Sequence, residues 1–197
     1  MIVRNKYIYE ITEGVGPSRL KPAVIKLAIG SNPDSIFENK VITAAAIASR
    51  ETDTPILTHT DGVGGVELLE KLKVEGIPAH RIIIGHSCDS NVPDYRRSIV
   101  DGGAYIGFDR FGLEMFQSGA TRVECLHALL QQGFSSKIIV SHDCGFCQRG
   151  QVVSNDYLHN NPMHFSRNIM PKLRARGVLQ ATLDSILRDN PRRYFQG

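Results

Sequence analysis

Pro-Ile-Leu-Thr-His-Thr at residues 55–60 and Arg-Ile-Ile-Ile-Gly-His-Ser at residues 81–87 are short apolar runs that each stop at a histidine. A third run, Lys-Ile-Ile-Val-Ser-His-Asp at residues 137–143, stops at a histidine and an aspartate. Short runs rich in β-branched residues are typical of strands buried on both faces, as in parallel sheets. Titratable residues are costly inside such a sheet but useful at its edge. The three runs therefore predict parallel strands whose ends come together around a metal.

Two further runs, residues 23–29 and 104–109, extend the series to five strands. Their chemically active residues recur at intervals of 33, 27, 23 and 34 residues: Lys26, His59, His86, Asp109 and Asp143. Helical patterns fill the intervals and the end of the chain: 35–50 (with Ser35 as its cap), 64–75, 93–100, 121–132, 165–176 and 179–188. Repeated strand–helix units give a parallel sheet with helices outside it.

The five units predict an α/β fold of the (β/α)8 TIM-barrel type. In such barrels the chemistry lies at the rim formed by the C-terminal ends of the strands. A complete barrel needs roughly 250 residues, and the chain has 197. We therefore expect one domain, residues 1–197, that forms an incomplete barrel about three units short of the complete fold.

Composition limits the classes of partner. A net charge of +3 without a basic stripe argues against nucleic acid. No run of about 18 apolar residues is present, so no membrane partner is expected. The N-terminus lacks the apolar core of a secretory signal, and four scattered cysteines do not form a disulfide framework. A reduced, cytoplasmic setting is the expectation.

The strand-end residues His59, His86 and Asp143 favour a metal site. A single histidine at a strand end is more often a hydrogen-bonded structural residue. Here two histidines lie at equivalent ends of successive strands, and an aspartate lies at the end of a later strand. This combination favours metal binding over a structural role. Two imidazoles and a carboxylate suit zinc or another first-row divalent metal.

Lys26 has two interpretations. A protonated lysine has no lone pair for a metal, and its burial among apolar neighbours is costly. It could line a barrel and pair with a carboxylate. It could instead react as the neutral amine with CO2 to give a carbamate that bridges two metals, and burial favours the neutral amine by lowering its pKa. The sequence leaves both open.

Several motifs together resemble the phosphotriesterase family of the amidohydrolase superfamily. The motifs occur in the family's order and at its spacing, and they extend over essentially the whole chain. They are Val-Ile-Lys-Leu-Ala at 24–28, Thr-His-Thr at 58–60, Ile-Gly-His-Ser at 84–87, Gly-Phe-Asp-Arg-Phe-Gly at 107–112, Val-Ser-His-Asp at 140–143 and Asn-Pro-Arg-Arg-Tyr-Phe at 190–195. The resemblance implies a binuclear metal site at the mouth of a (β/α)8 barrel, with zinc as the expected divalent metal. It also implies that the chain supplies about five C-terminal βα units of that barrel, strands 4 to 8.

The resemblance also implies roles for individual residues. Lys26 would be the carbamylated bridging ligand, and His59 and His86 would complete the second metal's ligands. Asp143 would bind the first metal and take the proton from the attacking metal-bound hydroxide, which a divalent metal makes available near pH 7. The substrate would be a lactone, ester or phosphotriester. The alternative for Asp143 is a cap of the following helix.

Asp109 and Arg110 refine the expected substrate. An Asp-Arg pair at this strand end is similar to the lactonase-like branch of the family. Arg110 would orient a carbonyl or carboxylate group through charge-assisted hydrogen bonds; its alternative role is a surface salt bridge. The segment 144–162 lies where the family forms its substrate pocket, so a small lactone or ester is the expected partner.

The sequence departs from the family at one point: it contains no His-x-His pair. The family's first strand carries that pair, and the chain is expected to begin near strand four, so the first metal would keep only Asp143 and the carbamate. One or two metals are therefore expected. The chain is either part of a hydrolase that needs the missing N-terminal strands, or a catalytically inactive metal-binding or interaction module. Unpaired edges near Ile25 and Ile139 predict pairing with a second copy or with a complementing N-terminal fragment.

Overall fold

A parallel sheet of five strands forms the centre of the molecule. A computed structural model describes residues 2–30, 35–92, 94–144 and 162–197. The strands are β1 (Ile25–Ala28), β2 (Ile56–His59), β3 (Ile82–Ile84), β4 (Tyr105–Phe108) and β5 (Ile138–Val140). Their order in the sheet follows the chain, and all four pairings are parallel. This sheet, with helices between its strands, confirms the predicted α/β fold, and its five strands fit an incomplete barrel.

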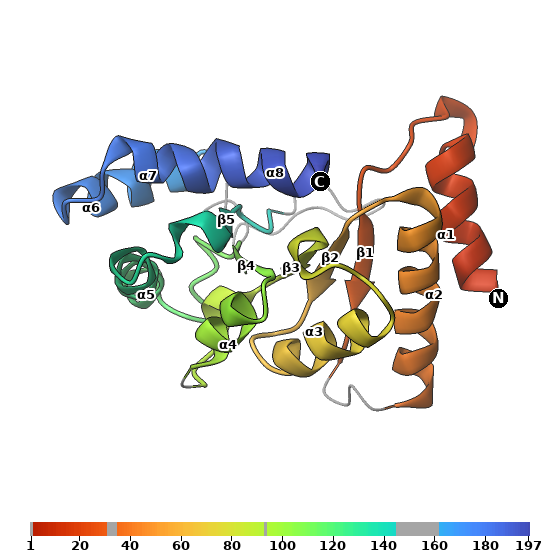
Figure 1. The fold of residues 1–197 in the computed structure, drawn as a ribbon. Coiled ribbons are helices and arrows are strands. Elements are labelled where there is room, and N and C mark those ends of the chain that lie inside the picture. Colours follow the sequence, from red (N-terminus) through yellow and green to blue (C-terminus); the bar gives the residue numbers. More distant parts are fainter. Residues whose placement is uncertain (1, 31–34, 93, 145–161) are drawn as a thin grey trace.

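Helices connect the strands (Figure 1). The connecting helices are α2 (Ile36–Thr52), α3 (Gly65–Val74), α4 (Tyr95–Asp101) and α5 (Gly119–Gln131), and α1 (Ile2–Glu13) precedes β1. Ser35 caps α2 as predicted, because its hydroxyl accepts a hydrogen bond from the backbone N–H of Glu38 at 3.1 Å. Ser118 does the same for α5 through the N–H of Thr121, so that helix begins two residues before its predicted start.

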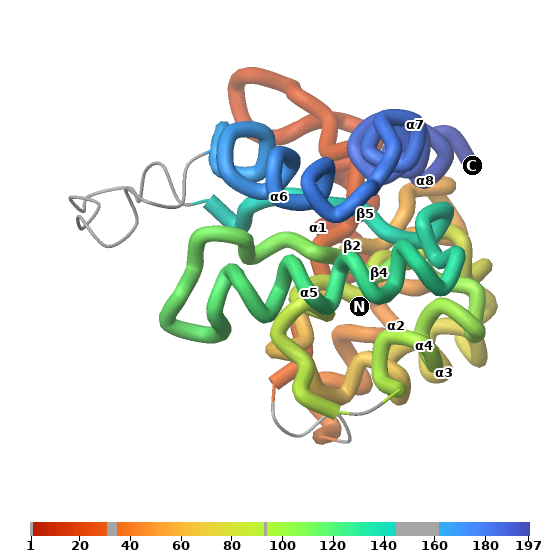
Figure 2. The backbone as a smooth tube through the Cα atoms, turned by 90° about the vertical axis from the view of Figure 1, so that its left-hand side faces the viewer, coloured from red at the N-terminus to blue at the C-terminus, as the bar shows by residue number. Residues whose placement is uncertain are grey.

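The C-terminal helices contain two widened turns. α6 (Met170–Ala175), α7 (Gln180–Asp184) and α8 (Asn190–Gln196) lie across the sheet from α3 and α4 (Figure 1; Figure 2). π-helical turns at Phe165–Ile169 and Ser185–Asp189 precede α6 and α8, each of which has a proline near its start. Proline lacks an N–H and crowds the preceding turn, and the wider turn lets the helix continue to residue 196 instead of ending at 188.

The sheet has an extensively packed face and a sparsely packed face. Most buried apolar side chains form one cluster between the sheet and the surrounding helices. The other face carries a small cluster of Ile83, Tyr105 and Tyr194. Tyr194 belongs to α8, and its ring packs edge-on against Tyr105 with the ring centroids 5.9 Å apart. The Tyr194 hydroxyl is buried and has no hydrogen-bond partner among the described residues.

The edge strand β1 differs from its prediction. Ile25 and Leu27 are buried, whereas Lys26 and Ala28 are exposed. The prediction that Lys26 is buried on a strand covered on both faces is therefore wrong. Side chains alternate between the two faces of a strand, and only the face with Ile25 and Leu27 packs into the main core.

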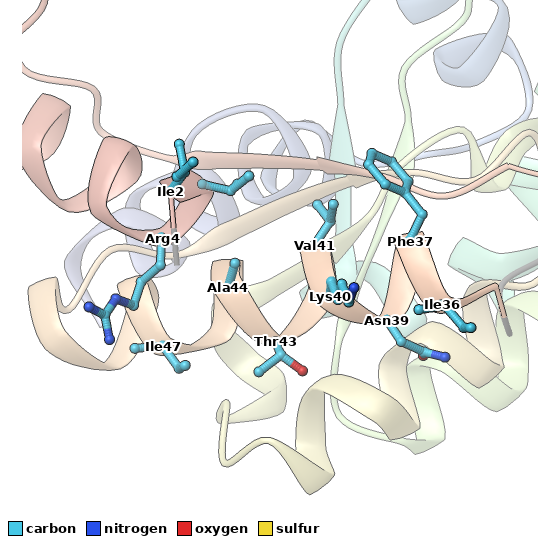
Figure 3. Close-up of a pocket in the computed structure, with 11 residues that line it drawn as sticks. Ile2, Arg4, Ile36, Phe37, Asn39, Lys40, Val41, Thr43, Ala44 and Ile47 are labelled. Carbon is cyan, nitrogen blue, oxygen red and sulfur yellow. The ribbon is translucent and has the colours of Figure 1, made fainter.

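An apolar groove of about 900 Å³ lies between α1 and α2. Figure 3 shows Phe37 and Val41 projecting from one side of α2, with Ile2 of α1 nearby. Ile2, Ile36 and Phe37 are 86, 76 and 75% exposed. The predicted site residues do not line this groove. Of the helices that the structure describes, none has the length and apolar character needed to cross a membrane.

Candidate metal and catalytic site

The predicted site residues lie at or just beyond the C-terminal ends of the strands. His59 ends β2, and His86, Asp109 and Asp143 follow β3, β4 and β5 by one to three residues. His86 and Asp143 have left-handed backbone conformations, with φ of 56° and 48°. This region is uncommon outside glycine, although Asp and His enter it more readily than most residues. The chain therefore turns sharply where these side chains leave the strands.

Two imidazoles meet at the centre of the site. His59 Nδ1 lies 2.8 Å from His86 Nε2, and the two rings are nearly perpendicular. The other nitrogen of His86, Nδ1, lies 3.0 Å from Asp109 Oδ1. The backbone N–H of His86 also donates to the Asp109 carboxylate. Asp109 therefore holds both the ring and the backbone of His86.

Asp109 acts as an ionised acceptor. Burial alone would raise the pKa of its carboxyl, but the hydrogen bonds from His86 and the positive charge of Lys26 outweigh that effect, so the pKa lies below its ordinary value. An ionised carboxylate can only accept hydrogen bonds. His86 Nδ1 consequently carries the hydrogen, and its Nε2 presents a lone pair toward His59.

Arg110 connects three carboxylates. Its Nε donates to Asp143 Oδ2 at 3.0 Å, and its Nη1 donates to Asp89 Oδ2 at 3.0 Å and to Asp61 Oδ1 at 3.3 Å. Only 6% of the Arg110 side chain is exposed, and the guanidinium lies over the Phe116 ring, 4.4 Å from its centroid. Arg110 and Asp89 are buried, whereas Asp61 and Asp143 are 63% and 43% exposed, so these ion pairs are not confined to the surface. The contact of Arg110 with a substrate stays a prediction.

A second arginine anchors the cluster. Arg122 of α5 is fully buried and donates to Asp89 Oδ1 from Nε at 3.0 Å and from Nη2 at 2.7 Å. Its remaining donors reach the backbone carbonyl of Leu113. Asp89 is thus paired with an arginine on each carboxylate oxygen, which fixes Arg110 beside Asp143.

Lys26 points toward the same rim. Its Nζ lies 3.4 Å from the carbonyl oxygen of Thr58, next to His59. Desolvation lowers the pKa of its amine, although the charges of Asp109 and Asp143 oppose that change. The structure brings the amine near the site, and its carbamylation stays a prediction.

Some sequence signals lie elsewhere. His142 turns away from the rim and accepts a hydrogen bond from the backbone N–H of Phe165 at 3.3 Å. Residues 145–161, which include Cys147 and most of the predicted pocket segment, are outside the described residues.

Sequence reasoning missed Asp61, Asp89 and Arg122. Asp61 and Asp89 follow the strand-end histidines by two and three residues, which is a usable signal. The sequence signal for Arg122 is weaker, because it is only a charged residue beside the apolar positions of a helix.

The donor set fits a divalent cation in part. Two imidazole nitrogens converge, and Asp143 Oδ2 lies 4.0 Å from His86 Nε2. Within the described ranges, however, no three His, Cys, Asp or Glu side chains are grouped closely enough to hold a metal. The expected third ligand is a modified Lys26, and Asp143 is held by Arg110. The residues therefore fit the two-histidine part of a metal site.

Comparisons with known proteins identify the family of the chain. The family model described as the phosphotriesterase family matches residues 2–195. The aryldialkylphosphatase of Saccharolobus solfataricus is 32% identical over 200 residues, which cover 98% of this chain and 64% of that protein.

Solved structures give the same result. An organophosphorus hydrolase from Deinococcus radiodurans superposes with a TM-score of 0.90 at 32% identity, covering 98% of this chain and 61% of that one. A mutant of a lactonase from the same organism has a TM-score of 0.88 at 33% identity, with 98% and 63% covered. The chain spans less than two thirds of the length of each of these three proteins. With its strand order, its rim residues and a family match over nearly its whole length, the chain belongs to the phosphotriesterase family.

Proposed function

We propose that this chain is part of a metal-dependent hydrolase that cleaves a lactone, ester or phosphotriester. The observation that carries the proposal is the convergence of His59 Nδ1 and His86 Nε2 at 2.8 Å, beside Asp143, on the rim of a phosphotriesterase-family sheet. In this proposal His59, His86, Asp143 and a carbamylated Lys26 hold one or two zinc ions. A bound divalent metal supplies a water of lowered pKa and polarises the substrate oxygen.

The chain's own residues then have distinct tasks. Asp143 accepts the proton of the attacking water through its carboxylate, of which Arg110 holds Oδ2. Asp109 keeps His86 in the tautomer whose Nδ1 carries the hydrogen and whose Nε2 presents a lone pair. Arg110 has two of its three nitrogens engaged by carboxylates, so Nη2 is the nitrogen we assign to a substrate carbonyl or carboxylate oxygen.

A second candidate is a metal-binding or interaction module without turnover. The absence of a His-x-His pair from the sequence favours it. In that case the histidine pair binds one metal, and hydrolysis requires strands supplied by another polypeptide.

Lactone and aryl-ester hydrolysis distinguishes the two. We expect the purified chain with zinc or cobalt to show little or no turnover. Co-expression with the N-terminal part of a phosphotriesterase-family relative, which supplies the His-x-His strand, should raise turnover, and Asp143→Asn in the same mixture should abolish it. The hydrolase proposal fails if the mixture stays inactive although both parts form a stable complex. Robust turnover by the chain alone, lost in His59→Ala, would reject the inactive module.

A further inference from the structure

Asp61 lies beside His59 but is outside the predicted ligand set. We infer that Asp61 is a positioning residue whose carboxylate fixes the tautomer and orientation of His59, so that Nδ1 presents its lone pair to the site. The inference rests on the proposed function in one respect, namely that a divalent metal occupies the site.

The contact between the two side chains determines the tautomer. Asp61 Oδ1 lies 3.1 Å from His59 Nε2. An ionised carboxylate accepts hydrogen bonds and donates none, so Nε2 carries the hydrogen. A neutral imidazole has a single N–H, and Nδ1 of His59 is therefore the nitrogen with the lone pair. That nitrogen faces His86.

The Asp61 carboxylate is partly exposed, so it needs further contacts to hold the His59 imidazole in place. The Asp61 side chain is 63% exposed, and isolated exposed ion pairs contribute little. Its Oδ1, however, also accepts from Arg110 Nη1 at 3.3 Å. Arg110 is held in turn by Asp89. The exposed carboxylate is thus tied to a buried cluster whose members are already ordered.

The backbone also supports this placement. Asp61 has φ of 43°, in the left-handed region. The residue directly follows Thr60, whose hydroxyl donates to the carbonyl oxygen of Gly85 at 2.9 Å. The turn after β2 is therefore attached to the end of β3, and it directs the carboxylate back toward His59.

Together, Asp61 and Asp109 leave each histidine with one nitrogen that carries a lone pair. Each carboxylate takes the N–H of one ring, at 3.1 Å for His59 and 3.0 Å for His86. The remaining nitrogens then hold two lone pairs that face each other at 2.8 Å. Two lone pairs repel at that distance. A cation that accepts both of them removes the repulsion, with the two nitrogens moving apart to form zinc–nitrogen bonds of about 2.0–2.1 Å, so this arrangement favours an incoming metal.

Loss of Asp61 would let the pair close on itself. His59 could then carry its hydrogen on Nδ1 and donate it to His86 Nε2, which satisfies both rings without a cation. A metal would have to break that hydrogen bond before binding. Removing the outer-shell partner of a metal-binding histidine typically lowers metal affinity about 10–100-fold.

Long-range 1H–15N NMR of the metal-free, full-length chain at pH 8 tests the tautomer directly. His59 is assigned as the imidazole signal that disappears in His59→Gln. We expect the Nε2–H tautomer in the wild type. In Asp61→Asn the amide can donate to Nε2, and we expect His59 to shift to the Nδ1–H tautomer or to a mixture. Asp94→Asn is the matched control, because Asp94 is also exposed and left-handed (φ 57°) but lies at the start of α4.

A zinc titration of the same three proteins supplies the second readout. We expect Asp61→Asn to bind zinc about 10–100-fold more weakly with unchanged stoichiometry, and Asp94→Asn to bind like the wild type. An Nδ1–H tautomer in the wild type would overturn the inference, as would an Asp61→Asn protein with unaltered tautomer and zinc affinity. If the wild type binds no zinc, the proposed metal dependence fails, and the NMR spectra alone decide the role of Asp61.

Discussion

His59 and His86 occupy different surroundings although their rings touch. The His86 side chain is 3% exposed, whereas that of His59 is 32% exposed. A buried histidine held by a carboxylate through both its ring and its backbone N–H has little freedom. His59 therefore faces the solvent side of the pair, and an ion entering from solvent meets it first.

Zinc binding should depend on His59. His59→Ala removes one of the two converging nitrogens, and we expect zinc affinity to fall by at least about tenfold, the lower end of the effect of losing even an outer-shell partner. Competition with a chromophoric chelator measures the affinity. His80→Ala is the control, because His80 is exposed and distant in the fold from the pair. Equal zinc affinities in the two variants would show that His59 does not bind the metal.

Stability should fall in mild acid partly through His59. Burial, with a contribution from His86, lowers the pKa of the His59 imidazole below its ordinary value near 6.5, although Asp61 opposes this change. Below about pH 6.5 the unfolded chain takes up the proton more readily than the folded chain. The free energy of unfolding therefore decreases as the pH falls toward the folded-state pKa.

Urea unfolding of the metal-free protein at pH 8 and pH 5.5 measures this effect. His59→Gln should lose less stability between the two pH values than the wild type does. His142 also has a lowered pKa and remains in both proteins, so only the difference between them reports on His59. The same pH dependence in both would contradict the assignment.

The residues at the strand ends could be predicted from the sequence. The side chains that pair with them could not. His59, His86, Asp109 and Asp143 follow apolar runs, and parallel strands bring such ends to one rim. The pairing of Arg110 with Asp89 and Asp61 depends on which loops fold over the rim, and no spacing along the chain encodes that choice.

At the scale of elements, the close approach of β2 and β3 sets the distance between the histidines. A Cβ atom at Gly85 would overlap the backbone carbonyl oxygen of Thr58. We expect Gly85→Ala to destabilise the fold by about 1–3 kcal/mol, as overpacking does, and to separate the histidine pair. Urea unfolding measures the stability. Gly30→Ala is the control, since its added methyl meets only the flexible Glu38 side chain. A similar loss of stability in both variants would show that the close contact of β2 and β3 at Gly85 is not the cause.

The start of α2 offers a second test. Ser35→Ala removes the side-chain acceptor for the N–H of Glu38 and should cost about 1 kcal/mol of stability. Ser35→Asp retains an acceptor at the helix N-terminus and should remain close to the wild type in urea unfolding. If the two variants lose the same stability, the cap is not the cause.

Local sequence signals predict where most helices and strands lie. Ser35, for example, indicates the start of α2 in the sequence. The exceptions depend on contacts between parts of the chain that are distant in sequence. The continuation of the last helix past Pro191 needs a π-helical turn, which no local pattern announces. The exposure of Lys26 was missed because an apolar run does not reveal which face of its strand lies uncovered.

At the scale of the whole molecule, two surfaces are candidates for association. The strands β1 and β5 are the edges of the sheet, and edge strands pair readily with other chains. We expect the isolated chain to self-associate, and Ala28→Lys on β1 to reduce association, because a lysine on an edge strand opposes pairing. Light scattering after size exclusion measures the mass.

The groove between α1 and α2 is the competing surface. Phe37→Lys should shift the mass only if exposed apolar side chains there drive association. A monodisperse monomer of the wild-type chain would refute association through either surface.

The agreement between strand order and chain order has a consequence for synthesis on the ribosome. Each strand from β2 to β5 that leaves the exit tunnel has a hydrogen-bonding neighbour that is already made, so the sheet can grow by one strand at a time. Tyr194 of α8 follows all five strands in the chain, so its ring can pack against Ile83 and Tyr105 only after those strands have been made. α8 is therefore added during synthesis to a sheet whose five strands already exist.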